Sequence, residues 1–161
     1  MVETVISLLI LSGAFVATLN TVSASRATYL TTSDRLLGLT LAEDLLAELL
    51  AKDYREEDST LIGLDLLEAE GAGRSRYDDV DDYDGWSSSP PQLSDATQMQ
   101  GVDGYTRSVE VDWVSSMSPD TPSNSDQGLK RVTVTVLRGE RQIAQLVAYR
   151  AESYETAGED E

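Results

Sequence analysis

The chain has 161 residues, of which 40% are hydrophobic, and 29 acidic against 12 basic side chains give it a net charge of -17. This length suits one domain with one modest core, and so acidic a chain repels phosphate, which argues against nucleic acid as a main partner. The sequence contains no Cys and no His, which excludes a disulfide framework, thiolate metal sites and His-based catalysis, so we expect no enzymatic activity and no organic cofactor.

An uncharged apolar segment opens the chain. Residues 4–25 are 22 positions without a charged residue or a proline. As a helix they would extend about 33 Å, enough to cross a bilayer. Three interpretations are open: a secretory signal peptide with a cleavage site near Ala24, a single-span anchor, and a helix that associates with copies of itself. A signal peptide should begin with basic residues, whereas the only charged side chain before this segment is Glu3.

The residues from Met1 to Leu11, with Glu3 ahead of the apolar run, are followed by the small-residue patch Ser12–Phe15. This arrangement resembles the mature N-terminus of type IV pilins and type II secretion pseudopilins. In that family a prepilin peptidase cuts after a glycine, the new N-terminus is usually methylated, and a glutamate near the start precedes an apolar helix. The resemblance implies an already processed subunit. The chain departs from the family pattern in one respect, because the family usually has this glutamate at the fifth position and here it is the third.

The resemblance also implies a function. It predicts a structural subunit that polymerises through its N-terminal helix into an extracellular type IV pilus-like filament at the bacterial cell surface, after residence in the inner membrane. The implied partners are identical subunits, the inner membrane, the pilus assembly machinery and the prepilin peptidase. Two alternatives stay open: a minor pilin or pseudopilin of a type II secretion or DNA-uptake machine, and a membrane-anchored acidic binding module.

Three groups of residues follow as candidates for assembly. A buried carboxylate is costly when isolated, so we expect Glu3 to pair with the N-terminal amine of Met1 on a neighbouring copy, an amine that is usually methylated in the family that the chain resembles. We expect the helix to melt inside a filament somewhere within Gly13–Ser25, because Gly13 lowers helix stability and Thr18 and Asn20 have weak helix propensity. The residues expected to pack in a filament core are apolar: Val5, Leu8, Leu9, Leu11, Phe15 and Leu19.

The helical pattern continues from Arg26 to about residue 54, which predicts one helix of about 50 residues ended by the charged cluster 55–59. Leucines lie on two nearly opposite faces, so both faces must be covered. The chain's own sheet can cover one face and sister helices the other, and a central helix in a compact monomer explains this segment equally well. The first face holds Leu30, Leu37, Leu41 and Leu45, and the second holds Leu36, Leu39, Leu46 and Leu50.

An acidic connector follows, with 13 acidic and 3 basic residues in 54–104. Residues 61–67 could form a short strand or a helical turn, and Pro90-Pro91 favours an extended loop. The aspartates of this connector could bind Ca²⁺, which takes six to eight oxygen ligands, or form a solvated acidic loop; Tyr83 and Trp86 are predicted to anchor the loop to the sheet. The candidate calcium ligands are Asp79, Asp81, Asp82 and Asp84, next to Asp78.

Alternating residues predict three antiparallel strands at 105–114, 129–137 and 142–150, with a hairpin at 138–141 and a long exposed loop at 115–128. In the second strand we place Val132, Val134 and Val136 on the apolar side, opposite Lys130, and in the third we place Ile143, Val147 and Tyr149 together. The fold class is therefore α+β and pilin-like, with one long N-terminal helix on a small antiparallel sheet. The expected divisions are 1–25, 26–54, 55–104, 105–150 and an acidic tail at 151–161.

Overall fold

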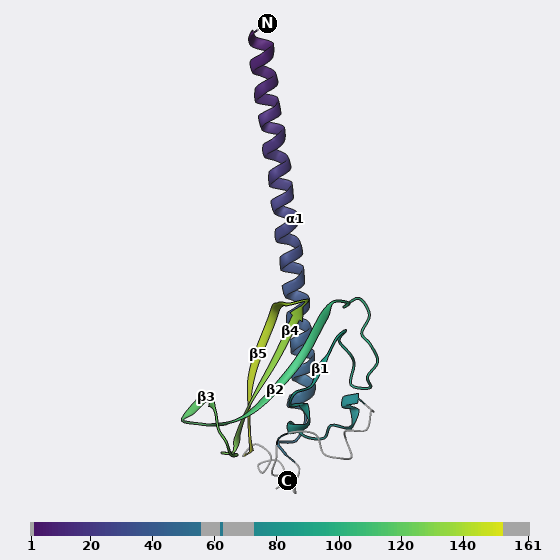
Figure 1. Ribbon diagram of the computed structural model, residues 1–161, viewed down its shortest axis with the longest axis vertical. Helices are drawn as coiled ribbons and strands as arrows, with labels where there is room; N and C mark the ends of the chain where they lie inside the picture. The colour runs from purple at the N-terminus through teal and green to yellow at the C-terminus, as the bar shows by residue number, and fades with distance from the viewer. Residues whose placement is uncertain (1, 56–61, 63–72, 153–161) are drawn as a thin grey trace, which may run out of the picture. The chain divides into compact units, whose positions relative to one another are not determined.

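A computed structural model describes residues 2–55, 62 and 73–152. One long helix and a five-stranded antiparallel sheet make an α+β arrangement (Figure 1), which confirms the predicted fold class. The chain divides into two compact units, residues 1–37 and 38–161. The elements are the helix α1 (Val2–Leu50), the 3-10 turns η1 (Gly73–Arg76) and η2 (Asp81–Tyr83), and the strands β1 (Ser87–Ser88), β2 (Tyr105–Ser115), β3 (Ser118–Pro122), β4 (Leu129–Arg138) and β5 (Arg141–Ala151).

The helix α1 is 49 residues long and contains no proline. It ends four residues before the predicted boundary, because the backbone N–H of Lys52 donates to Leu49 O at 3.0 Å in a tight turn. Asp53 then forms an isolated parallel bridge with Asp79. The connector therefore takes over the backbone hydrogen bonds at this point, before the charged residues that we expected to end the helix. The predicted strand or turn at 61–67 lies outside the described residues, apart from Ile62.

The sheet has the strand order β1-β2-β4-β5, and β3 pairs with the end of β2. All pairs are antiparallel, and valines face one another across the two central strands, as in the pair Val109↔Val134. The three predicted strands are confirmed to within one residue at each end. The expected loop at 115–128 is wrong in part, because Ser118–Pro122 forms β3, a polar strand with no apolar alternation to announce it.

The core lies between the C-terminal turns of α1 and the inner face of the sheet. On the helix, Leu41, Leu45 and Leu49 are buried, which confirms burial for two leucines of the first predicted face. On the second face, Leu36, Leu39 and Leu50 are exposed by 63%, 38% and 37%. The sheet covers its side of the core with valines at every second position, as the alternation predicts: Val109, Val111, Val132, Val134 and Val136.

The register of β5 differs from the prediction. A β-bulge between Val136 and Leu137 of β4 leaves Ile143 as an additional residue in β5, so the alternation changes face there. Ile143 points toward the helix, where its Cγ2 leaves no room for a side chain at Gly38. Val147 and Tyr149 lie on the outer face and are 50% and 43% exposed. The three residues therefore do not share one face.

Lys130 is a second correction. The sequence analysis places it on the polar side of β4, but its side chain is fully buried. Residues two apart in a strand point the same way, and Lys130 therefore lies on the same face as Val132.

Candidate functional site: an exposed apolar helix

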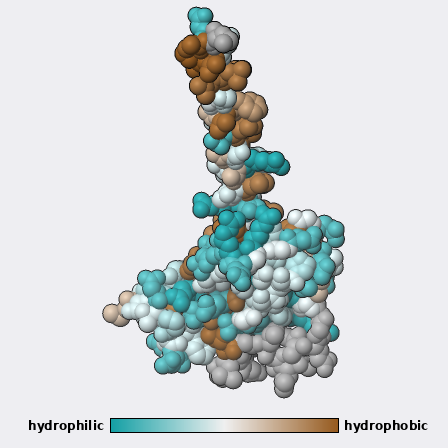
Figure 2. All heavy atoms as spheres, turned by 45° about the horizontal axis from the view of Figure 1, so that its top comes forward, coloured by the Kyte–Doolittle hydropathy of each residue, from teal (hydrophilic) through white to brown (hydrophobic). Residues whose placement is uncertain are grey.

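The N-terminal unit exposes its apolar side chains. All six residues predicted to pack in a filament core are more than half exposed, and apolar atoms cover much of this part of the helix in Figure 2. An exposed apolar surface of this kind marks a site of protein or membrane contact. The exposed fractions are Val5 60%, Leu8 70%, Leu9 66%, Leu11 71%, Phe15 64% and Leu19 52%.

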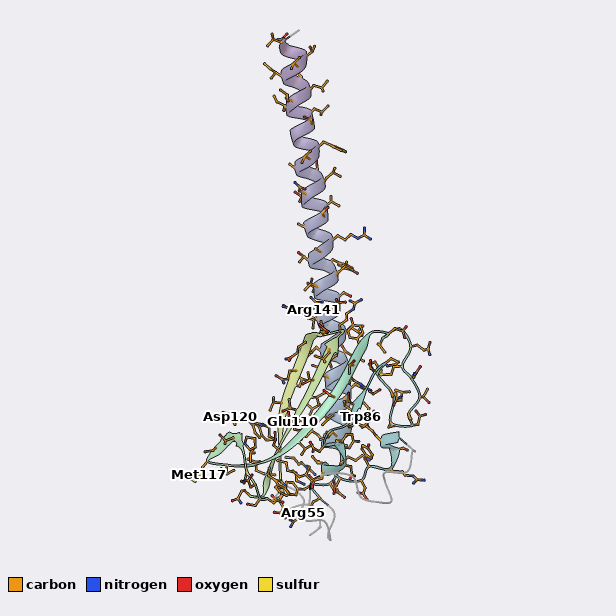
Figure 3. The ribbon with its side chains drawn as sticks, viewed as in Figure 1. Arg55, Trp86, Glu110, Met117, Asp120 and Arg141 are labelled. Atoms are coloured by element: carbon orange, nitrogen blue, oxygen red, sulfur yellow. The ribbon has the colours of Figure 1, made fainter. Side chains whose placement is uncertain are left out.

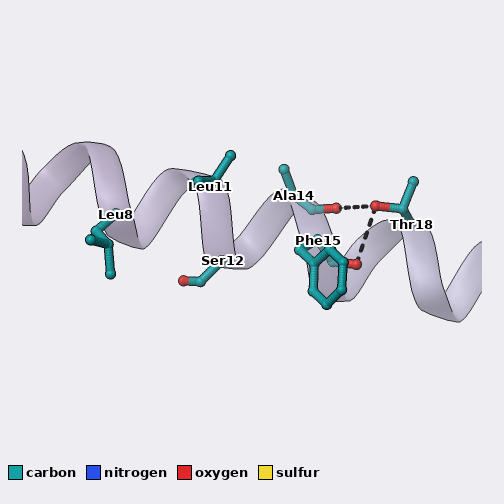
Figure 4. A pocket seen from close by; sticks show the side chains of 6 residues that line it. All are labelled: Leu8, Leu11, Ser12, Ala14, Phe15 and Thr18. Atoms are coloured by element: carbon teal, nitrogen blue, oxygen red, sulfur yellow. Dashed lines mark hydrogen bonds between the residues drawn. The ribbon is translucent and has the colours of Figure 1, made fainter.

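Six hydroxyl groups of this unit bond back to the helix itself. The Thr18 hydroxyl donates to the carbonyls of Ala14 at 2.6 Å and Phe15 at 3.1 Å (Figure 4). Further hydroxyls donate in the same way to carbonyls three or four residues earlier. Because these donors are satisfied within the helix, they do not need water, and the segment can enter lipid or a dry helix interface at lower cost. The further donors are Ser7, Ser12, Thr21, Thr28 and Thr31.

Two open grooves run along the apolar segment and share Leu8 and Ser12. Small residues between larger ones let a second helix approach closely, since side-chain ridges of one helix fit grooves of another. One groove is lined by Leu8, Leu11, Ser12, Ala14, Phe15 and Thr18 (Figure 4), and the other by Thr4, Val5, Leu8, Leu9 and Ser12.

The length and composition of α1 also suit a membrane. Its most apolar segment is fully exposed in the single chain. Of the described residues, this helix is the one that is long and apolar enough to cross a bilayer. Such a helix is weak support for a membrane anchor, because signal sequences have the same properties.

The predicted assembly residues at the helix start lie where the sequence puts them. Glu3 is exposed in the first turn of α1, where a carboxylate is favoured by the helix dipole. Met1 lies outside the described residues. The helix is continuous through Gly13, Thr18 and Asn20 in the single chain. Melting of residues 13–25 concerns the assembled filament and stays a prediction.

The aspartates of the connector are used by the fold. Asp79 Oδ1 accepts the backbone N–H groups of Asp81 at 2.6 Å and Asp82 at 3.3 Å. Asp82 Oδ2 accepts those of Asp78 and Asp79, and Asp84 Oδ1 accepts that of Val111 at 2.9 Å. Among the described residues no three acidic side chains converge in a geometry that could hold a metal ion. The geometry therefore gives the Ca²⁺ hypothesis no support, and it places Asp79, Asp81 and Asp82 in buried positions that a solvated loop would not have.

The connector carries a second group of residues that the sequence analysis did not anticipate. The buried Arg74 donates from Nε to Glu48 Oε1 at 2.9 Å and from an Nη to Oε2 at 3.0 Å. The Tyr83 hydroxyl also donates to Glu48, at 3.0 Å. Burial opposes ionisation of Glu48, but the hydrogen bonds and charge of Arg74 outweigh it and hold the pKa of Glu48 below its ordinary value.

The two aromatic residues predicted to anchor the connector to the sheet make the closest of their side-chain contacts elsewhere: Tyr83 bonds to Glu48 of α1, and Trp86 lies against Arg74 of η1. Tyr83 is fully buried, and the Arg74 guanidinium lies 4.2 Å from the centre of the Trp86 ring. On β2, the fully buried Arg107 donates to Leu41 O and to Asp44 at 3.3 Å each. These cations therefore join α1, the connector and the sheet, and their contacts are structural. The alternation of the strand indicates that Arg107 faces inward, because it lies two residues from Tyr105 and two from Val109, which are both buried.

No protein-family model, curated protein or solved structure matches the chain. The layout of a long apolar N-terminal helix with an antiparallel sheet is pilin-like.

Proposed function

We propose that this protein is a structural subunit that polymerises through its N-terminal helix into an extracellular type IV pilus-like filament at the bacterial cell surface. The observation that carries the proposal is the exposure of every apolar residue from Val5 to Leu19 that is expected to pack. Among the described residues of the first unit these side chains are left exposed, whereas in a filament each helix would be covered by those of neighbouring subunits. Before assembly the same helix would lie in the inner membrane, after processing by a prepilin peptidase.

Glu3 gives this proposal a mechanism. In a bundle of apolar helices its carboxylate and the N-terminal amine of an arriving subunit are both costly if unpaired. Pairing relieves both costs and also sets the axial register, because an offset subunit leaves two charges without partners.

The test is Glu3→Gln, which keeps the shape of the side chain and removes its charge. We expect subunits to reach the membrane and be processed normally, yet to give few or no filaments in sheared surface material viewed by electron microscopy. The matched control is Glu140→Gln, which removes an exposed carboxylate from the turn after β4 and should leave the filament yield unchanged.

Two outcomes would contradict the proposal or redirect it. A normal filament yield from Glu3→Gln cells at wild-type subunit level rejects the role of Glu3 between subunits. Wild-type cells in which the protein occurs only in trace amounts within filaments of another subunit would favour the minor pilin or pseudopilin.

A further inference from the structure

A lysine and an aspartate lie in contact in the interior of the second unit, residues 38–161. The Lys130 side chain is 0% exposed and that of Asp81 is 6% exposed, and Lys130 Nζ lies 2.7 Å from Asp81 Oδ2. The same Nζ donates to the carbonyl of Tyr54 and lies 3.9 Å from the centre of the Tyr54 ring. The amine is thus held against one carboxyl oxygen in a place that water does not reach.

The other oxygen of this carboxyl is unsatisfied. Asp81 Oδ1 is buried and has no hydrogen-bond partner among the described residues. A carboxylate can accept about four hydrogen bonds, and leaving a buried charged oxygen unpaired is costly. The arrangement is therefore poor for a permanent ion pair, and it would suit a neutral carbonyl oxygen better.

We propose that Lys130 and Asp81 condense to an intramolecular isopeptide bond. The ammonium first passes one proton to Oδ2 through the 2.7 Å hydrogen bond, which leaves a neutral amine beside a neutral carboxylic acid. Nζ then attacks Cγ, and the Nζ–Cγ bond forms. A second proton moves from Nζ to Oδ2, the Cγ–Oδ2 bond breaks, and Oδ2 leaves as water. Oδ1 remains as the carbonyl oxygen of the amide.

Several features favour this condensation. Burial raises the pKa of Asp81 to about 6 although Lys130 opposes the shift, and the negative charges of Asp79 and Asp126 act in the same direction as burial. The neutral acid is therefore accessible near neutral pH. Holding the two reacting groups in contact replaces a bimolecular encounter by an intramolecular one. The product also removes two charges from an interior where ions are costly.

The bond would join the connector to the sheet. Asp81 begins η2 and Lys130 lies in β4, and the two are 49 positions apart in the sequence. A covalent link there would close this part of the chain into a loop and resist separation of the connector from the sheet under load. The proposed bond lies within the second unit and does not depend on the filament function.

Tryptic mapping of the full chain, purified in detergent and digested after denaturation, tests the bond directly. The chain contains two lysines, Lys52 and Lys130. Trypsin cannot cleave after an acylated lysine, so we expect one branched species in which peptide 77–107 is joined to peptide 108–131. It should be lighter than the sum of the two linear peptides by one water molecule. The linear peptide 108–130 should fall at least tenfold relative to Lys130→Arg, which keeps the cleavage site and cannot form the bond.

Two further variants complete the experiment. Lys52→Arg should retain the branched species, because it leaves both reacting groups in place in the folded unit. Asp81→Ala should lose the branched species and restore cleavage after Lys130, and this second result does not need the variant to fold stably. A wild-type digest that contains linear 77–107 and 108–130 in full amounts would overturn the proposal and leave Lys130 and Asp81 as an ion pair. A mass deficit that maps elsewhere, with cleavage after Lys130 intact, would overturn it equally.

Discussion

The helix α1 contributes to two units that treat the same residue types in opposite ways. Leu8 is 70% exposed in the first unit, and Leu45 is 0% exposed in the second. The second unit, in turn, buries the cations Arg107 and Lys130 completely. Apolar side chains outside and charged ones inside are both departures from the usual distribution. In the second unit the buried cations Arg107 and Lys130 have partners in the chain, Asp44 and Asp81, whereas the apolar residues of the first unit are exposed in the single chain.

Under the proposed function, this difference separates what stabilises a subunit from what joins subunits. The second unit is stabilised by burial of leucines and valines and by the ion pairs that connect α1, the connector and the sheet. The leucines from Leu8 to Leu19 of the first unit are more than half exposed in the single chain, so they bury little apolar surface there. Substitutions in one helix should therefore have separable effects on folding and on assembly.

The largest contrast is expected between Leu45→Ala and Leu8→Ala. Removing a fully buried leucine costs about 2–5 kcal/mol of unfolding free energy, because it loses transfer free energy and leaves a cavity. Leu8→Ala should leave the unfolding free energy unchanged and reduce filament yield. The chain's two tryptophans, Trp86 and Trp113, both lie in the second unit, so denaturant unfolding followed by their fluorescence measures that unit alone. Equal losses from the two substitutions would remove the distinction between the units.

The next effect concerns Glu48. Replacing it by Gln weakens charge-assisted hydrogen bonds to Arg74, and we expect a loss of roughly 1.5–3 kcal/mol at pH 7. The pKa of Glu48 in the folded chain lies below its ordinary value of 4.5, because the hydrogen bonds and charge of Arg74 outweigh burial. The unfolded chain therefore takes up a proton first as the pH falls, so the stabilisation is complete above about 4.5 and is lost as the pH falls through the folded pKa.

The measurement is the difference in unfolding free energy between wild type and Glu48→Gln at a series of pH values from 7 downward. It should shrink with acidity, whereas Glu140→Gln, at an exposed site, should differ little from wild type throughout. If the difference in unfolding free energy between wild type and Glu48→Gln stays constant with pH, ionisation of Glu48 contributes nothing to stability.

The regular elements could be predicted because their patterns are local. A run without proline and with helical spacing gave α1, and alternating valines gave β2 and β4. The two-residue alternation of β4 places Lys130 on the same face as its valines, whereas the charge of Lys130 predicts the polar face. Composition alone does not show that an aspartate 49 positions away would meet this lysine in the interior.

Other features have no local signal. The strand β3 has the sequence SPDTP and is stabilised by pairing with β2 rather than by an apolar face. Its turn residue Met117 is 93% exposed, and Figure 3 shows Met117 and Asp120 together at this hairpin. The bulge at Ile143 depends on the register with β4. The apolar helix surface was predictable as a surface, but its occupant is a property of an assembly and not of one chain.

The smallest contrast is between the two glycines of α1. At Gly38 an added Cβ would lie 2.5 Å from Ile143 Cγ2, whereas at Gly13 nothing lies within 4 Å. In either place alanine gains about 1 kcal/mol of helix propensity. At Gly38 this gain is offset by an overpacking cost of about 1–3 kcal/mol, since Ile143 is β-branched and cannot easily move its methyl group away. Gly38→Ala should therefore lower the unfolding free energy of the second unit by up to about 2 kcal/mol, and Gly13→Ala should not change it.

The double variant Gly38→Ala/Ile143→Ala decides whether this methyl contact is the cause. Ile143→Ala removes Cγ2 and leaves Cβ, which lies 3.1 Å from the added Cβ at position 38, so the alanine there meets a milder close contact and keeps more of its gain in helix propensity. The loss in the double variant should be smaller than the sum of the two single losses, with a coupling of roughly 0.5–3 kcal/mol, as is usual for residues in contact. Additive losses would place the cost of Gly38→Ala elsewhere. Gly13→Ala should instead slow amide exchange at residues 13–25 in assembled filaments, if Gly13 promotes melting there, and unchanged exchange would remove Gly13 from that role.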